Sequence, residues 1–101
     1  YDQDVIILCA GWQGRVNLED TLFAGALVEK LGLAYEVECD AAQAALVLYK
    51  AAKSDMDKFL SASSHVQRLK KFDIGKDITF CLTIDEYNVV PILRDNELVR
   101  S

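Results

Sequence analysis

A loop near the start of the chain holds the residues with the clearest capacity for chemistry. Gly11 and Gly14 lie in it, and Asn17 opens an amphipathic stretch directly after it. Where a loop leads into a helix, free backbone N–H groups meet the positive end of the helix dipole, and anions bind there. The pattern is neither a Walker loop nor a dinucleotide fingerprint, because Gly-Lys-Ser/Thr and the third glycine are missing. It indicates a phosphate site or, alternatively, a plain turn of the chain.

Two acids, Glu19 and Asp20, occupy the first turn of the helix expected after this loop. A carboxylate at this point could bind a hard cation such as Mg²⁺ beside a bound phosphate. The ordinary alternative is that acids favour the first helical turn because of the helix dipole. Adjacent helical residues point about 100° apart, so we expect one of the two acids to face the loop.

Cys9 and Arg15 suggest a different mechanism, because C-x5-R is the spacing found in cysteine-dependent phosphatases. There, loop N–H groups and the arginine hold phosphate over a thiolate. Leu8 stands where that motif has His, and Val16 stands where it has Ser or Thr. A buried thiol with a solvated arginine is the alternative, and Trp12 in the same loop is either a pocket wall or a packed anchor.

A second polar group, SSH followed by an arginine, lies later in the chain at Ser63, Ser64, His65 and Arg68. Ser64 is most simply a helix cap, and the only histidine is most simply a surface residue. The helix start at Ser64 is nevertheless a second N-terminus that favours an anion, with Arg68 one turn along. If it faces the glycine loop, a phosphate or sulfonate would fit between the two.

Hydrophobic patterning places these residues on an α/β framework. The continuous apolar run over residues 4–9 predicts a strand covered on both faces. A helix should begin at the N-cap Asn17 and end at Gly32. The small residues at positions 24–26 would let the backbone of this helix lie close to the sheet.

The remaining segments continue the mixture of helices and strands. Residues 33–39 suit a short strand or an extended connection. In residues 76–84 propensity favours a strand, whereas an Asp cap and the apolar spacing permit a short helix, and we expect the helix. Pro91 places a strand over residues 89–93 at a sheet edge, and Asp95-Asn96 turns the chain into a closing hairpin. Three further helices are expected: residues 40–52 capped by Asp40, a short helix from Ser54, and a helix from Ser64 with Val66, Leu69 and Phe72 facing inward.

Composition limits the classes of function. The 101 residues, about half of them apolar, suit a single α/β domain over residues 1–101, with a small mixed sheet and several helices packed on it. A net charge of −5 argues against general affinity for nucleic acid or anionic membranes. Three cysteines without a CxxC pair favour buried reduced thiols in a cytoplasmic protein. No apolar stretch reaches the roughly 20 residues that span a bilayer, and nothing resembles a signal peptide.

The strings CAGWQGRVNLEDTLFAGALV, SSHVQRL and FCLTIDEYNVVPILRDNELV together resemble the 2-phosphosulfolactate phosphatase family over nearly the whole chain. The resemblance implies a magnesium-dependent enzyme of coenzyme M biosynthesis and related sulfolactate metabolism. It also implies that this chain, which starts at Tyr1 without a methionine, is the C-terminal half of a two-part layered enzyme. We therefore expect the N-terminal half as a partner, together with a homo-oligomer and a small anionic phosphorylated substrate.

The resemblance also assigns roles by position. Magnesium would be held by Glu19 and Asp20, which with Arg15 form the expected catalytic set. Substrate would be bound by Gly11, Trp12, Gly14 and Arg15 in the loop and by Ser64, His65 and Arg68 in the later string. The expected reaction is hydrolysis of 2-phosphosulfolactate to sulfolactate and phosphate, with a metal-bound water. The alternatives are a thiol mechanism through Cys9 and Arg15, or a non-catalytic module that binds an anion or metabolite.

Overall fold

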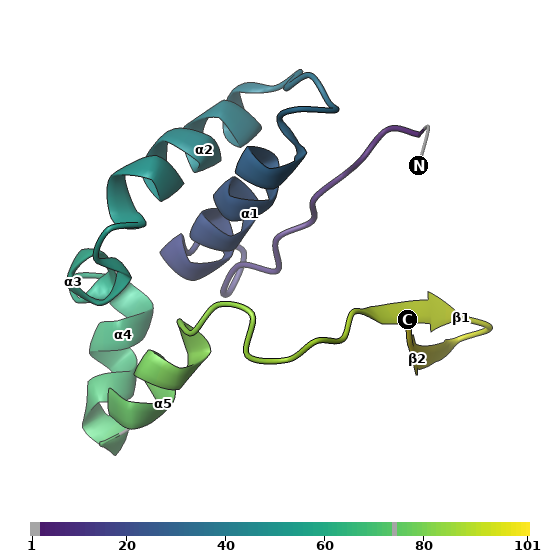
Figure 1. Ribbon diagram of the computed structural model, residues 1–101. Helices are drawn as coiled ribbons and strands as arrows, with labels where there is room; N and C mark the ends of the chain where they lie inside the picture. Colours follow the sequence, from purple (N-terminus) through teal and green to yellow (C-terminus); the bar gives the residue numbers. More distant parts are fainter. Residues whose placement is uncertain (1–2, 74) are drawn as a thin grey trace.

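Five α-helices and one hairpin make up the computed structural model, which describes residues 3–73 and 75–101. Helices α1 and α2 lie side by side, α3, α4 and α5 gather at one end of that pair, and the hairpin projects away from all of them (Figure 1). The α/β class expected from the sequence is confirmed. The elements are α1 (Leu18–Leu31), α2 (Asp40–Ala52), α3 (Met56–Leu60), α4 (Ser64–Leu69), a 3-10 turn η1 (Lys70–Phe72), α5 (Gly75–Cys81), β1 (Pro91–Arg94) and β2 (Glu97–Arg100).

The closest packing in the molecule is between α1 and α2. A Cβ added at Gly25 would collide with the backbone oxygen of Ala45 and would lie 2.6 Å from Tyr49 Cβ. The thin middle of α1 was expected to lie against a sheet, and the structure corrects this, because the surface that approaches it is α2. Around this contact the buried core contains Leu22, Tyr49, Ala52, Leu60 and Val66.

Local capping chemistry places the starts of α1, α3 and α4 within one residue of the expected positions. Asn17 caps α1 as predicted, and its side-chain oxygen accepts from Asp20 N. The caps of α3 and α4 are Asp55 and Ser63 rather than Ser54 and Ser64. In each case the neighbouring residue supplies the oxygen that accepts an N–H of the first turn.

Two further details of the helices differ from expectation. Asp40 is the first residue of α2 and not its cap, which is Cys39 without a side-chain hydrogen bond. Phe72 was expected to face inward but is 72% exposed, because the helix gives way to the 3-10 turn η1 before that residue. The expectation of a helix within residues 76–84 is confirmed by α5.

The segment over residues 4–9 is the main error of the sequence-based fold. It is extended but forms no strand, and Ile6 and Leu8 are 90% and 92% exposed. A strand needs a neighbour to exchange hydrogen bonds with, and among the described residues no strand pairs with this segment. The apolar pattern was read correctly as extended backbone, but the burial that it implies is absent. Residues 33–39 also form no strand: a turn, in which Ala34 N donates to Leu31 O, is followed by a connection without regular secondary structure.

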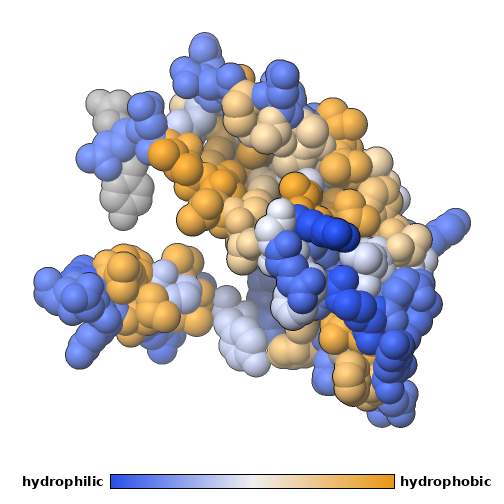
Figure 2. Space-filling view, turned by 180° about the vertical axis from the view of Figure 1, so that it is seen from behind, coloured by the Kyte–Doolittle hydropathy of each residue, from blue (hydrophilic) through white to orange (hydrophobic). Residues whose placement is uncertain are grey.

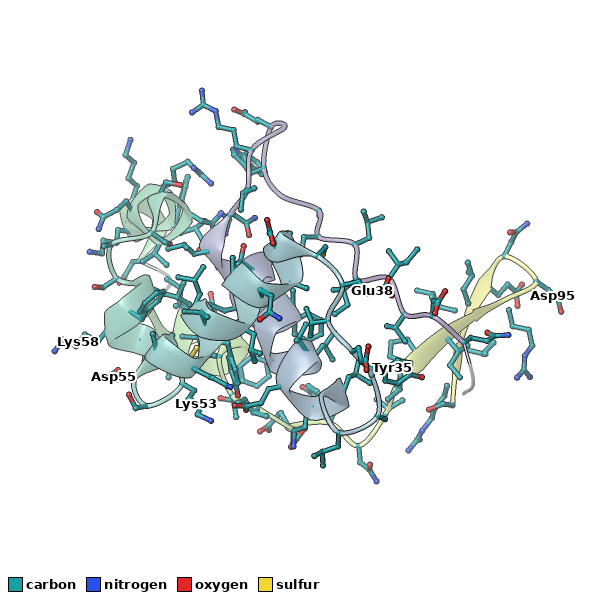
Figure 3. All side chains as sticks on the ribbon, turned by 90° about the horizontal axis from the view of Figure 1, so that it is seen from above. Tyr35, Glu38, Lys53, Asp55, Lys58 and Asp95 are labelled. Carbon is teal, nitrogen blue, oxygen red and sulfur yellow. The ribbon has the colours of Figure 1, made fainter. Side chains whose placement is uncertain are left out.

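The hairpin confirms the predicted closing turn. Strands β1 and β2 pair antiparallel, with Leu93 opposite Leu98, and β1 begins at Pro91, two residues later than expected. Asp95 and Asn96 both have positive φ, as a two-residue hairpin turn requires, and Asp95 marks the tip in Figure 3. Apolar side chains cover much of the hairpin and of the extended segment near the N-terminus (Figure 2). None of the helices in the described residues has the length and apolar character to cross a membrane.

Candidate functional site

The glycine loop closes on itself as a tight two-residue turn. Trp12 N donates to Arg15 O, and Arg15 N donates to Trp12 O, both at 2.9 Å. Gln13 and Gly14 between them have φ values of 50° and 72°, and Gly11 has a φ of 65°. A Cβ on Gly11 would collide with Arg15 O, so this position needs glycine both for its backbone angle and for space.

Asp20 ties this turn to the start of α1. Its Oδ2 atom accepts a 2.7 Å hydrogen bond from Gly11 N, while its own N–H donates to Asn17 Oδ1 at 2.9 Å. The N–H groups of Gly11, Trp12 and Arg15 are therefore used within the loop. Those of Gln13 and Gly14 have no hydrogen-bond partner among the described residues, and these two donors remain for an anion.

Glu19 points to a different partner from Asp20. Ser63 Oγ donates to Glu19 Oε1 at 2.8 Å, and the same Oγ accepts from Val66 N at the start of α4. Ser63 is only 4% exposed, and Glu19 Oε2 is buried without a hydrogen-bond partner among the described residues. The expectation that one of the two acids faces the loop is confirmed, since Asp20 does so and Glu19 faces α4.

The loop and the N-terminal turn of α4 meet at Trp12. The indole ring packs edge-on against His65, with ring centroids 6.4 Å apart, and Arg68 Cζ lies 5.2 Å from the indole centroid. Arg68 donates to His65 Nδ1 at 3.1 Å and reaches Ser64 Oγ at 3.5 Å. Four predicted substrate-binding residues, Trp12, Ser64, His65 and Arg68, thus form one cluster. Gly11, Gly14 and Arg15 belong to the adjoining loop.

A shallow open pocket of about 300 Å³ lies on the loop side of this cluster. Cys9 lines it, and its thiol donates to the backbone oxygen of Asp20 at 3.6 Å. Among the residues that the structure describes, no hydrogen bond joins this thiol to the side chain of Arg15. The pocket is lined by Cys9, Ala10, Gly11, Gly14, Arg15, Val16, Asn17 and Thr21.

The donor set for a metal is small in the part of the chain that the structure describes. No group of three or more His, Cys, Asp or Glu residues gathers there as a metal site. Magnesium, however, is commonly held by one or two carboxylates with waters and substrate phosphate completing the shell. Glu19 Oε2 is buried without a hydrogen-bond partner among the described residues, and the carboxylate of Asp20 faces the loop. Each acid by itself fits that limited role, since the two face different partners.

Sequence reasoning missed the role of Ser63 and a second open pocket. Ser63 joins α1 to α4 through a hydrogen bond to Glu19, 44 residues away. Local sequence patterns do not predict a contact over such a separation. The second pocket, about 330 Å³, lies on the far side of α4 and has no motif to mark it. Its lining consists of Asp57, Ser61, Val66, Lys70, Asp73, Gly75 and Ile78.

Comparison of the sequence with known proteins places this chain in a family. Residues 1–96 match the family model described as 2-phosphosulpholactate phosphatase. Three relatives are each named probable 2-phosphosulfolactate phosphatase. The one from Caldanaerobacter subterraneus is 36% identical over 99% of this chain and 42% of its own length. The one from Thermus thermophilus is 41% identical over 91% of this chain and 39% of its own length. The one from Gloeobacter violaceus is 40% identical over 88% of this chain and 36% of its own length.

The chain spans about two-fifths of the length of the curated relatives that it matches. No solved structure matches it.

Proposed function

Because the chain belongs to the 2-phosphosulpholactate phosphatase family, we propose that it supplies part of the active site of a phosphatase. The reaction is hydrolysis of 2-phosphosulfolactate, or a similar small anionic phosphomonoester, to sulfolactate and phosphate. These 101 residues act as one α/β domain at the C-terminal end of a longer polypeptide, whose remaining length completes the site. One observation carries the proposal: the glycine loop and the first turn of α4, far apart in sequence, meet at Trp12.

The loop is the phosphate-binding part of this site. The unused N–H groups of Gln13 and Gly14 and the side chain of Arg15 are donors suited to the equatorial oxygens of a phosphoryl group. Gly11 and Asp20 hold the loop in shape through their 2.7 Å hydrogen bond. With a net charge of −5 on the chain, the protein has no general attraction for anions, so local donors must hold the phosphate.

Magnesium is the proposed cofactor, with Asp20 and Glu19 as its protein ligands in this chain. When bound, the ion would acidify a water and neutralise charge on the transferred phosphoryl group. The orphaned oxygen of Glu19 and the loop-facing carboxylate of Asp20 support this assignment. Waters, substrate phosphate and the rest of the polypeptide would supply the other ligands.

The family and the cysteines support a proposal for the cellular setting. Cys9, Cys39 and Cys81 are unpaired and exposed, which suits a reducing cytoplasm. We propose that the enzyme works there, as a homo-oligomer in coenzyme M biosynthesis or related sulfolactate metabolism.

The test is phosphate release from 2-phosphosulfolactate by the full-length protein, with and without magnesium. Activity should require the ion, and at least one of Asp20→Asn and Glu19→Gln should lose more than about a hundredfold in rate, the scale for removing a key electrostatic group. Glu86→Gln, at an exposed acid beyond α5, is the matched control and should keep full activity.

Three outcomes would replace the proposal. Unchanged rates in both acid variants would remove Glu19 and Asp20 from the mechanism. Activity that resists EDTA but disappears in Cys9→Ser would replace magnesium with a thiol mechanism. Phosphate binding without turnover of any phosphomonoester would make the protein a non-catalytic anion-binding module.

A further inference from the structure

Arg68 is held in one place although it lies on the surface. Its guanidinium stacks on the face of Trp12 and donates to His65 Nδ1 at 3.1 Å. A surface arginine in water normally samples many rotamers, and fixing it in a complex costs free energy. Here Trp12 and His65, on two different segments, already hold the side chain, so less free energy is lost when a ligand binds. The side chain is exposed, so its remaining N–H donors are open to a ligand.

The hydrogen bond between the two side chains also fixes the imidazole of His65. A guanidinium can only donate, so Nδ1 of His65 is the acceptor and the ring proton of the neutral imidazole is on Nε2. The ring is further held by its edge-on contact with Trp12. Trp12, His65 and Arg68 therefore form a rigid patch with donors at its rim.

Arg15 is hydrogen-bonded to Trp12 through the backbone of the loop. Trp12 and Arg15 exchange both backbone hydrogen bonds of the tight turn, and residues directly opposite in such a pair project from the same face. The side chains of Arg15 and Trp12 therefore leave the turn on one side. One arginine, Arg68 on α4, lies over the indole ring, and the other, Arg15, belongs to the same tight turn as Trp12.

We propose that Arg68 binds an oxyanion on the carbon skeleton of the substrate, a carboxylate or sulfonate, while the loop with Arg15 holds the phosphate. This inference rests on the proposed function and adds to it a residue that determines specificity. A guanidinium fork matches a carboxylate or sulfonate with two parallel hydrogen bonds. The carboxylate of Glu19 lies at the start of α4, so an anion on this side needs a cation of its own.

The consequence is selection between phosphomonoesters. A substrate with a second anion uses both arginines, whereas a simple alkyl phosphate uses only the loop. A hydrogen bond to a charged group contributes about 1.5–3 kcal/mol, which corresponds to roughly 10- to 150-fold in binding. Loss of Arg68 should therefore reduce the affinity for substrates with a second anion by that factor and leave the affinity for simple alkyl phosphates nearly unchanged.

Binding can be measured without turnover, because Trp12 is the only tryptophan of these 101 residues and lies under Arg68. The full-length protein is titrated with sulfolactate, which has no phosphate, and the fluorescence that disappears in Trp12→Phe is taken as the signal. Arg68→Met should weaken the binding of sulfolactate at least tenfold and change the affinity for inorganic phosphate by no more than about twofold. Lys71→Met removes an exposed cation of η1 and is the matched control, expected to change neither. Arg68→Lys keeps the charge without the fork and should recover only part of the affinity.

Separate titrations with lactate and 2-hydroxyethanesulfonate tell which oxyanion Arg68 holds, since only the one bound there loses affinity in Arg68→Met. Equal weakening of sulfolactate and phosphate in Arg68→Met, or no weakening of either, would overturn the assignment. So would full sulfolactate affinity in Arg68→Met, whether or not the enzyme is active.

Turnover gives an independent readout. In Arg68→Met, kcat/KM for 2-phosphosulfolactate should fall at least tenfold while that for isopropyl phosphate stays within threefold, and an equal fall for both would contradict the proposal. If the protein hydrolyses no phosphomonoester at all but sulfolactate still depends on Arg68, the oxyanion site stands and the phosphatase proposal fails.

Discussion

Ser63 Oγ donates to Glu19 Oε1 at 2.8 Å across 44 residues of sequence, and the same hydroxyl caps α4. This hydroxyl thereby joins the first turn of α1 to the first turn of α4. Together with the contacts of Trp12 with His65 and Arg68, it connects the loop region before α1 to the cluster on α4. The assembly of the candidate site therefore depends on a residue with no direct role in the proposed chemistry.

Ser63→Ala should destabilise the protein by about 2 kcal/mol, because it removes a helix cap and leaves a partly buried carboxylate without its donor. Ser64→Ala is the control, since Ser64 is exposed and only reaches Arg68 at 3.5 Å. It should change stability by less than about 0.5 kcal/mol. Urea unfolding followed by circular dichroism measures both, and equal values for the two variants would contradict the structural role of Ser63.

Gly25→Ala should cost about 1–3 kcal/mol, the range for overpacking a tight contact. The added methyl would collide with the backbone of α2 at Ala45, and backbone cannot move aside as a side chain can. Gly75→Ala is the matched control because a Cβ there meets nothing within 4 Å, and it should be neutral or slightly stabilising. Thermal unfolding of both variants decides the matter, and a neutral Gly25→Ala would mean that α1 and α2 do not pack so closely.

Gly11→Ala should disrupt the loop more than Gly14→Ala does. Both positions have positive φ, but only at Gly11 would the methyl collide with Arg15 O. Gly14→Ala should therefore show the backbone strain alone, about 1 kcal/mol. In the full-length enzyme, phosphate release should fall much further in Gly11→Ala, together with a change in the Trp12 emission. Equal losses in the two variants would show that space at Gly11 is unimportant.

The ion pair between Lys53 and Glu29 gives a prediction about pH. Lys53 Nζ donates to Glu29 Oε1 at 2.8 Å, on the side of α2 where Lys53 is labelled in Figure 3. The hydrogen bond and charge of Glu29 raise the pKa of Lys53 above its ordinary value of 10.5. Because the pKa of Lys53 is higher in the folded than in the unfolded protein, the ion pair stabilises the fold fully at a pH below the ordinary pKa. This stabilisation is lost as the pH rises through the pKa of the folded protein. Since the pair is exposed, its contribution is small and screened by salt.

The measurement compares the wild-type protein with Lys53→Met by urea unfolding at pH 7 and above pH 11. The stability difference between them should shrink at the higher pH and also in 1 M salt. A difference that grows with pH would contradict the ion-pair assignment.

Local patterns predicted most of the fold, and contacts over long distances in sequence account for what they missed. Asn17 and the Asp95-Asn96 turn were predicted correctly because each acts within four residues of itself. The strand over residues 4–9 was wrong because a strand exists only with a neighbour, which sequence pattern does not supply. The sequence could not predict that the glycine loop and the start of α4 lie side by side, and the proposed anion site depended on this. The contact of Trp12 with Arg68 shows that they do.

The exposed segment at Ile6 and Leu8 has a consequence for handling these residues in isolation. Unpaired extended backbone with apolar side chains is a template for pairing between molecules. At high concentration, the 101 residues alone should therefore associate through this segment, and a charged residue such as Lys in place of Ile6 should keep them apart in solution.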